Sequence, residues 1–297
     1  MACVWTQTAA GPRFYLPGSS LRGVLRSAAE RLVACWQPNW GYVSDPFNNA
    51  SEGWVQRQRE REPSPSSADI YRMAGPIERC FGHTALRGRW TFGDAWMRNE
   101  RDAHIVVRDG VGISRRTGAA MNDIKFQFEA ITGGVFETTL TIVNYELWQL
   151  GLLAHALALL DGGQARLGYG TYRGMGRIRL AVTMMDWRWY GYLPSENAEG
   201  VRLPPLEQLA TLAGLDDSYG WRDKGQAIVL PLVPNATTFG SAWRLEPARG
   251  MALDGFASTD WDGLPWPQLA ELLAPTLNRW SLPDELQPWL PEAEVRQ

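Results

Sequence analysis

The order of periodic segments along the first 185 residues is the strongest constraint on the fold. Residues 13–36 predict a helix entry and a helix, because apolar residues recur along one stripe with a 3.6-residue period. Four segments with the alternation and the β-branched or aromatic content of strands follow, at residues 88–96, 103–113, 125–131 and 135–144. Residues 145–163 predict a second helix ended by glycines, and a glycine-rich turn and a strand come next. This order predicts an α+β fold with helices on one face of a sheet.

Composition sets the class of protein. The chain has 297 residues, of which 45% are hydrophobic and 21% charged, so it can bury a packed core. No stretch approaches the roughly 18 to 20 apolar residues of a membrane span, and the first residues lack the basic and apolar regions of a secretory signal. The three cysteines are few, odd in number and far apart, which favours a reducing compartment. We therefore expect a cytoplasmic protein without a membrane partner.

Charge is distributed unevenly. Residues 1–185 carry 21 basic and 16 acidic side chains, a net of +5, and residues 186–297 carry 8 and 16, a net of −8, which sum to the net charge of −3. Only two of the 29 basic residues are lysines. Arginine forks bind phosphate oxygens and stack on bases, so the first part favours a nucleic-acid partner. A GC-rich genome is an alternative explanation of the arginine bias, although it does not explain the uneven charge.

Two segments depart from the periodic pattern. Residues 37–76 are loop-like and include the charge run RQREREPSPSS, which predicts a solvated insertion. Residues 186–297 are rich in tryptophan, proline and acidic residues. Their tryptophans either stack on bases or fill a core or a protein interface, and the acidity favours protein contact. The predicted domains are 1–185, with the insertion near 37–76, and an accessory C-terminal region, 186–297.

The stretch YLPGSSLRGVLRSAAERL predicts a helix start that could hold an anion. Ser19 or Ser20 is expected to cap the helix, since their side-chain oxygens accept first-turn amides. The other first-turn amides and the helix dipole would form an anion site, and Arg22 and Arg26 lie one turn apart beside it. The alternative is an ordinary capped amphipathic helix with solvated arginines.

A second cluster of glycines lies in LGYGTYRGMGR. Its members are Gly168, Gly170, Gly174 and Gly176, with Arg173 and Arg177 between and after them. No Gly-Lys-Ser/Thr follows and the cluster does not open a helix, so it is neither a P-loop nor a dinucleotide fingerprint. Glycines let a backbone approach a ligand closely, and with arginines they favour an extended phosphate backbone over a single nucleotide.

The two stretches together resemble the RAMP superfamily of CRISPR-associated proteins. The segments CFG (80–82), GRWTFGDA (88–95), VRDGVGISRRTGAA (107–120) and FEAITGGVFETTLTI (128–142) are similar to the backbone subunit of type III effector complexes. The resemblance covers roughly residues 12–185. It implies a modified ferredoxin-like, RRM-like palm with an extended hairpin, the thumb, and copies that stack along one CRISPR RNA and place their thumbs in the guide–target duplex.

The resemblance also implies the RNA-binding residues. The residues expected to contact the guide backbone are Ser19, Ser20, Arg22 and Arg26. The glycine loop is expected beside the same groove, with Gly170, Arg173 and Gly174. The thumb segment, 109–121, is expected to contribute Arg115 and Arg116. The implied partners are CRISPR RNA, target RNA and the other subunits of the effector complex. RNA would be held mainly through phosphate, with sequence read by base pairing.

Catalysis is the point where the chain departs from the family. The backbone subunit often cuts target RNA with an aspartate from the loop before the PGSSLRG helix, whereas residues 1–16 contain no Asp, Glu or His. Either the start is short relative to the family or this copy is not catalytic; Asp102, Asp109 or Asp123 could substitute. No cofactor is expected, apart from Mg²⁺ if the chain is catalytic.

Two enzymatic alternatives stay open. One is a metal-dependent endoribonuclease that cuts target RNA within the complex. The other is a metal-independent ribonuclease that processes CRISPR RNA, for which the glycine loop offers Tyr169 and Tyr172 but no histidine.

A zinc site is the weakest hypothesis. Cys80 and His83 have metal-ligand spacing and Cys35 could join them, but a buried cysteine and a surface histidine explain the pattern more simply. His155, in an apolar helix, is expected in the core or at its rim.

Overall fold

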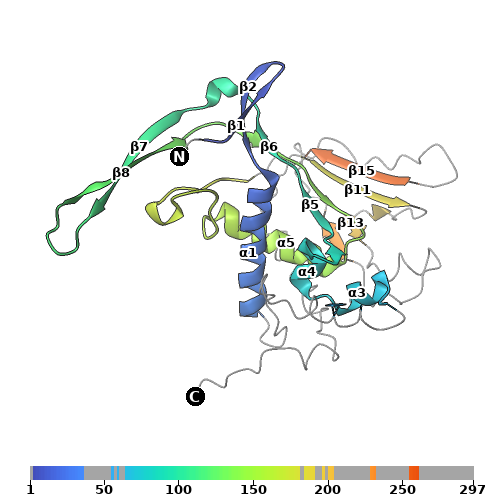
Figure 1. Cartoon of the computed structure of the whole chain (residues 1–297). Helices are drawn as coiled ribbons and strands as arrows, with labels where there is room; N and C mark the ends of the chain where they lie inside the picture. The colour runs from blue at the N-terminus through green and yellow to red at the C-terminus, as the bar shows by residue number, and fades with distance from the viewer. Residues whose placement is uncertain are drawn as a thin grey trace. The chain divides into compact units, whose positions relative to one another are not determined.

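A computed structural model describes the fold as two compact units. The first comprises residues 1–23 and 91–141, and the second comprises 24–90 and 142–297 (Figure 1). The residues that the structure describes are 3–36, 55–56, 59, 64–180, 184–190, 196–197, 200–203, 228–231 and 254–260. Most of the predicted insertion and of the Trp-rich region lies outside them.

The first unit is built on a four-stranded antiparallel sheet in the order β1-β2-β6-β9. Its strands are β1 (Trp5–Thr8), β2 (Gly11–Leu16), β6 (Ala95–Met97) and β9 (Phe136–Glu137). The sequence assigned residues 13–16 to the helix entry. That expectation was wrong, because residues 11–14 pair with β1 and residues 15–16 pair with β6.

A long hairpin extends from the same unit. Strands β7 (Ile105–Ile113) and β8 (Ala120–Ile131) pair antiparallel, with a register shift between Val111 and Ile113 (Figure 1). On one face, Gly110 and Gly112 leave room for side chains of β8, since a Cβ at Gly110 would lie within 3 Å of the Phe126 ring. Both strands were predicted, and residues 109–121, where the resemblance places the thumb, lie within this hairpin.

Helix α1 (Gly18–Trp36) begins in the first unit and continues into the second. Its buried residues are Leu21, Leu25, Ala28, Ala29 and Val33. They repeat every three or four positions, so they form one apolar stripe, as the sequence predicted. Arg22 is on the exposed side.

The second unit also contains the helices α3 (Ser67–Met73), α4 (Pro76–Phe81) and α5 (Leu147–Asp161). The sequence predicted α5 but treated residues up to 76 as loop. It missed α3, although Ser66 and Asp69 form a capping box across the helix start. Within this unit β3 (Gly82–His83) pairs with β4 (Leu86–Arg87). A further pair, β5 (Trp90–Phe92) with β10 (Leu140–Ile142), has most of its residues in the first unit.

The later part of the chain adds antiparallel strands. β11 (Met184–Tyr190) pairs with β15 (Asp254–Asp260), and β13 (Gly200–Leu203) lies between β12 (Glu196–Asn197) and β14 (Ile228–Pro231). A strand up to residue 185 was expected after the glycine cluster: residues 175–180 are not in a strand, residues 181–183 lie outside the described ones, and Met184 begins β11. The mixture of helices and antiparallel sheets confirms the predicted α+β class. The predicted domain boundary after residue 185 stays a prediction.

Candidate RNA interface

The start of α1 is held by the loop between β5 and β6. The backbone N–H of Gly18 donates to Oδ1 of Asp94 over 2.7 Å. Gly18 must be glycine, because a Cβ there would lie 2.5 Å from the carbonyl oxygen of Phe92 and 2.9 Å from that of Gly93. The segments PGSS and TFGDA, far apart in sequence, therefore pack as one structure.

This contact changes the predicted anion site. Ser19 and Ser20 lie inside the first helical turn, so the expectation that one of them caps the helix was wrong. The backbone N–H groups of Ser20 and Leu21 both donate to the carbonyl of Pro17. The carboxylate of Asp94 stands at the end of the helix where an external anion was expected, and it is favourable there because the helix dipole is positive. The hydroxyls of Ser19 and Ser20 remain exposed.

The two arginines of α1 have different surroundings. Nε of Arg26 lies 2.8 Å from Oε1 of Glu30, four residues later, and both side chains are largely buried, at 19% and 21% exposed. Arg22, one turn earlier, is exposed. The two arginines therefore differ in exposure, with Arg22 on the exposed side of the helix and Arg26 packed against Glu30.

Arg115 and Arg116 lie in the turn that joins β7 and β8. The turn is closed by backbone bonds from Ser114 to Ala119 and from Gly118 to Ser114, both 2.9 Å. Both arginines are exposed, and in the described part of the chain neither makes a hydrogen bond or an ion pair. The hairpin thus ends in two unpaired positive charges.

The glycine loop belongs to the second unit. All four of its predicted glycines have φ between +74° and +83°, a region that other residues rarely adopt. Around Gly176 the chain also approaches itself closely, and the N–H of Leu167 donates to the Gly176 carbonyl over 2.9 Å. The glycines are therefore needed to fold the loop, whatever it binds.

Some arginines of this loop stabilise its backbone, and others are exposed on its surface. Nη1 of Arg166 donates to the carbonyl of Thr171 over 3.0 Å. The guanidinium of Arg173 lies 6.0 Å from the centre of the Tyr169 ring, and Arg173 and Arg177 are exposed. The loop is therefore an exposed basic surface with aromatic rings on it.

The candidate catalytic carboxylates do not converge with one another. Asp102 is exposed in the short helix η2 (Glu100–Asp102), where its Oδ1 accepts from Asn99 over 3.2 Å. Asp109 is exposed in the middle of β7 and accepts from Gln127 over 2.9 Å. The side chain of Asp123 lies outside the described residues. In the described ranges no three His, Cys, Asp or Glu side chains gather in a way that could hold a metal ion. The described candidates therefore do not fit a Mg²⁺ ion.

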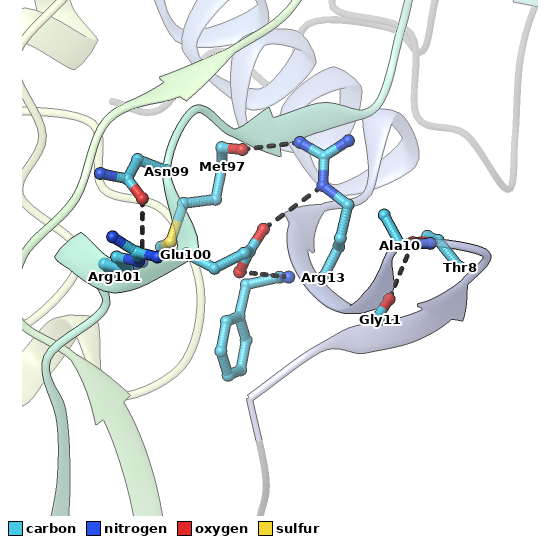
Figure 2. A network of polar contacts seen from close by, with 9 residues as sticks. Thr8, Ala10, Gly11, Arg13, Met97, Asn99, Glu100 and Arg101 are labelled. Carbon is cyan, nitrogen blue, oxygen red and sulfur yellow. Dashed lines mark hydrogen bonds and ion pairs between the residues drawn. The ribbon is translucent and has the colours of Figure 1, made fainter.

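A carboxylate that the sequence did not suggest contacts the N-terminal hairpin instead. Oε1 of Glu100 lies 3.4 Å from Nε of Arg13, and Oε2 accepts the backbone N–H of Phe14 over 3.1 Å (Figure 2). Nη2 of Arg13 also donates to the carbonyl of Met97 over 2.7 Å. Both oxygens of Glu100 are thus used to fix the strand β2, which is a structural role.

The cysteines and histidines do not assemble a metal site in the described ranges. Cys80 is buried, and burial raises the pKa of its thiol well above the usual value, whereas Cys35 is exposed. Nδ1 of His83 accepts the backbone N–H of Ala85 over 3.2 Å. His155 is half-buried, with its Nδ1 2.9 Å from the Gly151 carbonyl oxygen, and burial lowers its pKa.

A buried polar cluster in the second unit was also missed by sequence reasoning. Arg79 and Glu146 are fully buried, with Nη1 and Oε1 3.1 Å apart. The hydroxyl of Tyr71 donates to the same Oε1 over 2.7 Å, and Nε2 of Gln149 donates to the Tyr71 hydroxyl. The guanidinium groups of Arg79 and Arg89 each lie 4.4 Å from the centre of the Tyr71 ring. Burial, with the nearby Glu146 carboxylate, raises the pKa of Tyr71.

The chain combines an α+β fold with a hairpin that carries exposed arginines at its turn and with a basic glycine loop. The family model of the RAMP superfamily matches residues 4–179, so the chain belongs to the RAMP superfamily. Its general role is therefore that of a CRISPR-associated RNA-binding protein. A search of the curated proteins finds no match. No helix of the described part has both the length and the apolar character to span a bilayer.

Proposed function

We propose that the chain is a backbone subunit of a type III CRISPR effector ribonucleoprotein. It would hold guide RNA at the start of α1 and at the glycine loop, and space target RNA with the β7–β8 hairpin. The observation that carries this proposal is the hairpin itself, which ends in the exposed Arg115 and Arg116. Two unpaired guanidinium groups on a projecting turn suit phosphate contact, because they lose no existing partner on binding.

We also propose that this copy does not cut RNA itself. Residues 1–16 offer no Asp, Glu or His, and residues 5–16 form the hairpin β1–β2. In the described structure the carboxylate of Glu100 contacts Arg13 and Phe14 of this hairpin, and these contacts hold the strand in place. Threonine and glutamine oxygens, which β1 does carry, bind Mg²⁺ weakly without a carboxylate.

The test compares the wild-type chain with the double variant Arg115→Ala/Arg116→Ala. Single-stranded guide RNA affinity should fall by about tenfold for any sequence, and the slope of log affinity against log salt should shrink by about 0.7 for each lost phosphate contact. The matched control is Arg72→Ala/Arg98→Ala, which removes two exposed arginines that already pair with Asp69 and Glu137. Its affinity and salt slope should match the wild type.

The same proteins serve for a cleavage assay. Assembled complex is incubated with labelled target RNA with and without Mg²⁺, and the cuts are mapped. A Mg²⁺-dependent cut opposite this subunit that is lost in Asp102→Ala, Asp109→Ala or Asp123→Ala would identify it as an endoribonuclease. Equal RNA affinity of the wild type and the Arg115→Ala/Arg116→Ala variant would contradict the role proposed for the hairpin.

A further inference from the structure

Tyr172 has the most exposed side chain among the large hydrophobic residues that the structure describes. Its relative exposure is 104%, whereas that of Tyr169, three residues earlier, is 48%. A single exposed apolar residue is ordinary on a protein surface, so exposure alone shows nothing. Here the surroundings of the ring add three further observations.

The first is that the backbone on both sides of Tyr172 is fixed. The residue is the centre of the 3₁₀ turn η3 (Thr171–Arg173), which lies between Gly170 and Gly174, both left-handed. The N–H of Arg173 donates to the Gly170 carbonyl over 2.7 Å. Because only two side-chain torsions remain free, the ring can be held against a flat ligand at a small cost in conformational entropy.

The second is that the turn is braced from within the loop. Arg166 is half-buried and donates through Nη1 to the carbonyl of Thr171, the residue before Tyr172. At the far end, the N–H of Leu180 donates over 2.7 Å to Oδ1 of Asp161, the last residue of α5. The loop is therefore a closed structure that presents Tyr172 outward.

The third is the charge of the segment. Residues 162–180 contain four arginines and no aspartate or glutamate. Arg173 follows Tyr172 directly and is exposed, as are Arg177 and Arg179. An exposed ring in a segment that contains arginines and no acidic residue suits a ligand that has both flat apolar faces and phosphates, which is a nucleotide chain.

We propose that Tyr172 stacks on an unpaired base of single-stranded RNA bound across the glycine loop. This inference rests on the proposed RNA-binding function and adds to it a residue that contacts a base. The face of a base inside a duplex is covered by its neighbours, so stacking on Tyr172 requires an unstacked nucleotide. The loop would then distinguish single strands from duplex, whereas phosphate contacts alone bind both.

The test uses the full chain and three RNA probes of equal length: single-stranded oligoadenylate, a chain of abasic ribose phosphates, and a duplex. The variants are Tyr172→Ala, Tyr172→Phe and Tyr172→Leu. Removing a stacking aromatic weakens base binding by about tenfold. Tyr172→Ala and Tyr172→Leu should each lose that factor on oligoadenylate, and Tyr172→Phe should keep wild-type affinity. All four proteins should bind the abasic chain and the duplex equally.

Each contrary outcome has a separate meaning. If Tyr172→Ala weakens the abasic chain as much as oligoadenylate, the residue supports the loop and stacking is refuted. If Tyr172→Leu binds oligoadenylate like the wild type, an apolar contact has replaced stacking and the proposal fails. If Tyr172→Ala leaves all three probes unchanged, the ring faces a protein partner and the inference falls while RNA binding stands. If the wild type binds no probe at low salt, the proposed function itself fails.

Discussion

Arg79 in the second unit and the pair Arg115 and Arg116 in the first show two opposite uses of the same side chain. The guanidinium of Arg79 is fully buried, pairs with Glu146, and donates to the carbonyls of Arg72 and Ala74. Arg115 and Arg116 are exposed at a turn, without a partner in the described ranges. Arg79 therefore stabilises the fold, whereas Arg115 and Arg116 can bind a ligand.

The physical cost separates the two cases. Burying a guanidinium removes it from water at a cost of several kcal/mol, which its carboxylate and carbonyl partners must offset. An exposed arginine keeps its hydration and contributes little to stability. Substitutions in the buried cluster should therefore change the free energy of unfolding, and substitutions at the hairpin tip should change RNA affinity alone.

The largest effect is expected for Glu146→Gln. Glutamine keeps the shape and an acceptor oxygen for Tyr71, but it removes the charge that balances the buried Arg79. Leaving that guanidinium uncompensated should lower the free energy of unfolding by about 3 to 5 kcal/mol. Urea denaturation followed by circular dichroism measures the loss.

The matched comparison for this variant is Arg72→Ala. Arg72 forms an exposed pair with Asp69, with Nη2 and Oδ1 3.2 Å apart. Such pairs contribute about 0 to 1 kcal/mol, so this variant should stay close to the wild type. If both variants lowered the free energy of unfolding by the same amount, the distinction between buried, structural arginines and exposed arginines would be wrong.

The sequence predicted the elements whose signals are local. The apolar stripe of α1 and the strands of the β7–β8 hairpin can be read from periodicity, and both are confirmed. The strand β2 was missed because its stability comes from pairing with β1 and with the distant β6. Only tertiary structure supplies that second partner.

The candidate site divides in the same way. The pair Arg26 and Glu30 has the i, i+4 spacing that marks a helical ion pair, so its formation was readable from the sequence. The contact of Gly18 with Asp94 spans 76 residues, and that of Arg79 with Glu146 spans 67. No local pattern shows such distant partners, and the sequence therefore assigned the helix cap to a serine instead of to Asp94.

A smaller effect is expected from alkaline pH on the buried cluster. Burial raises the pKa of Tyr71 in the folded protein, whereas the unfolded chain ionises near the ordinary value of about 10. Above that pH the unfolded state loses a proton that the folded state retains, so stability falls as pH rises, by up to about 1.4 kcal/mol per pH unit. Cys80, also raised by burial, adds to the loss from about pH 9.

Urea denaturation between pH 8 and 11 measures this loss. Tyr71→Phe removes the phenol, so its stability should depend less steeply on pH above 10, with the contribution of Cys80 remaining. If the unfolding free energy of the wild type did not change from pH 9 to 11, Tyr71 and Cys80 would ionise in the folded protein as readily as in the unfolded chain. That result would contradict the contrast between the buried cluster and the exposed surface.

The smallest effect is expected at Asp94, a residue that contributes both to the fold and to the proposed RNA-binding surface. This exposed carboxylate both holds the fold, through the Gly18 amide 2.7 Å away, and stands at the helix end where RNA phosphate is proposed to lie. Asp94→Asn keeps an acceptor oxygen but removes the charge that interacts with the helix dipole. Unfolding free energy should fall by about 0.3 to 1 kcal/mol.

RNA affinity should move in the opposite direction for the same variant. A carboxylate at the helix start repels phosphate near Ser19, Ser20 and Arg22, so Asp94→Asn should bind single-stranded RNA about two- to fivefold more tightly at low salt, in line with the size of exposed charge interactions. The gain should shrink as salt rises, because an exposed charge is screened within about 10 Å at 0.1 M. Fluorescence anisotropy titrations at three salt concentrations measure it.

Asp94→Ala, which also removes the acceptor, separates the two contributions, since it should lose about 1 kcal/mol of stability. An affinity that does not rise for Asp94→Asn at any salt would place the RNA away from this helix end.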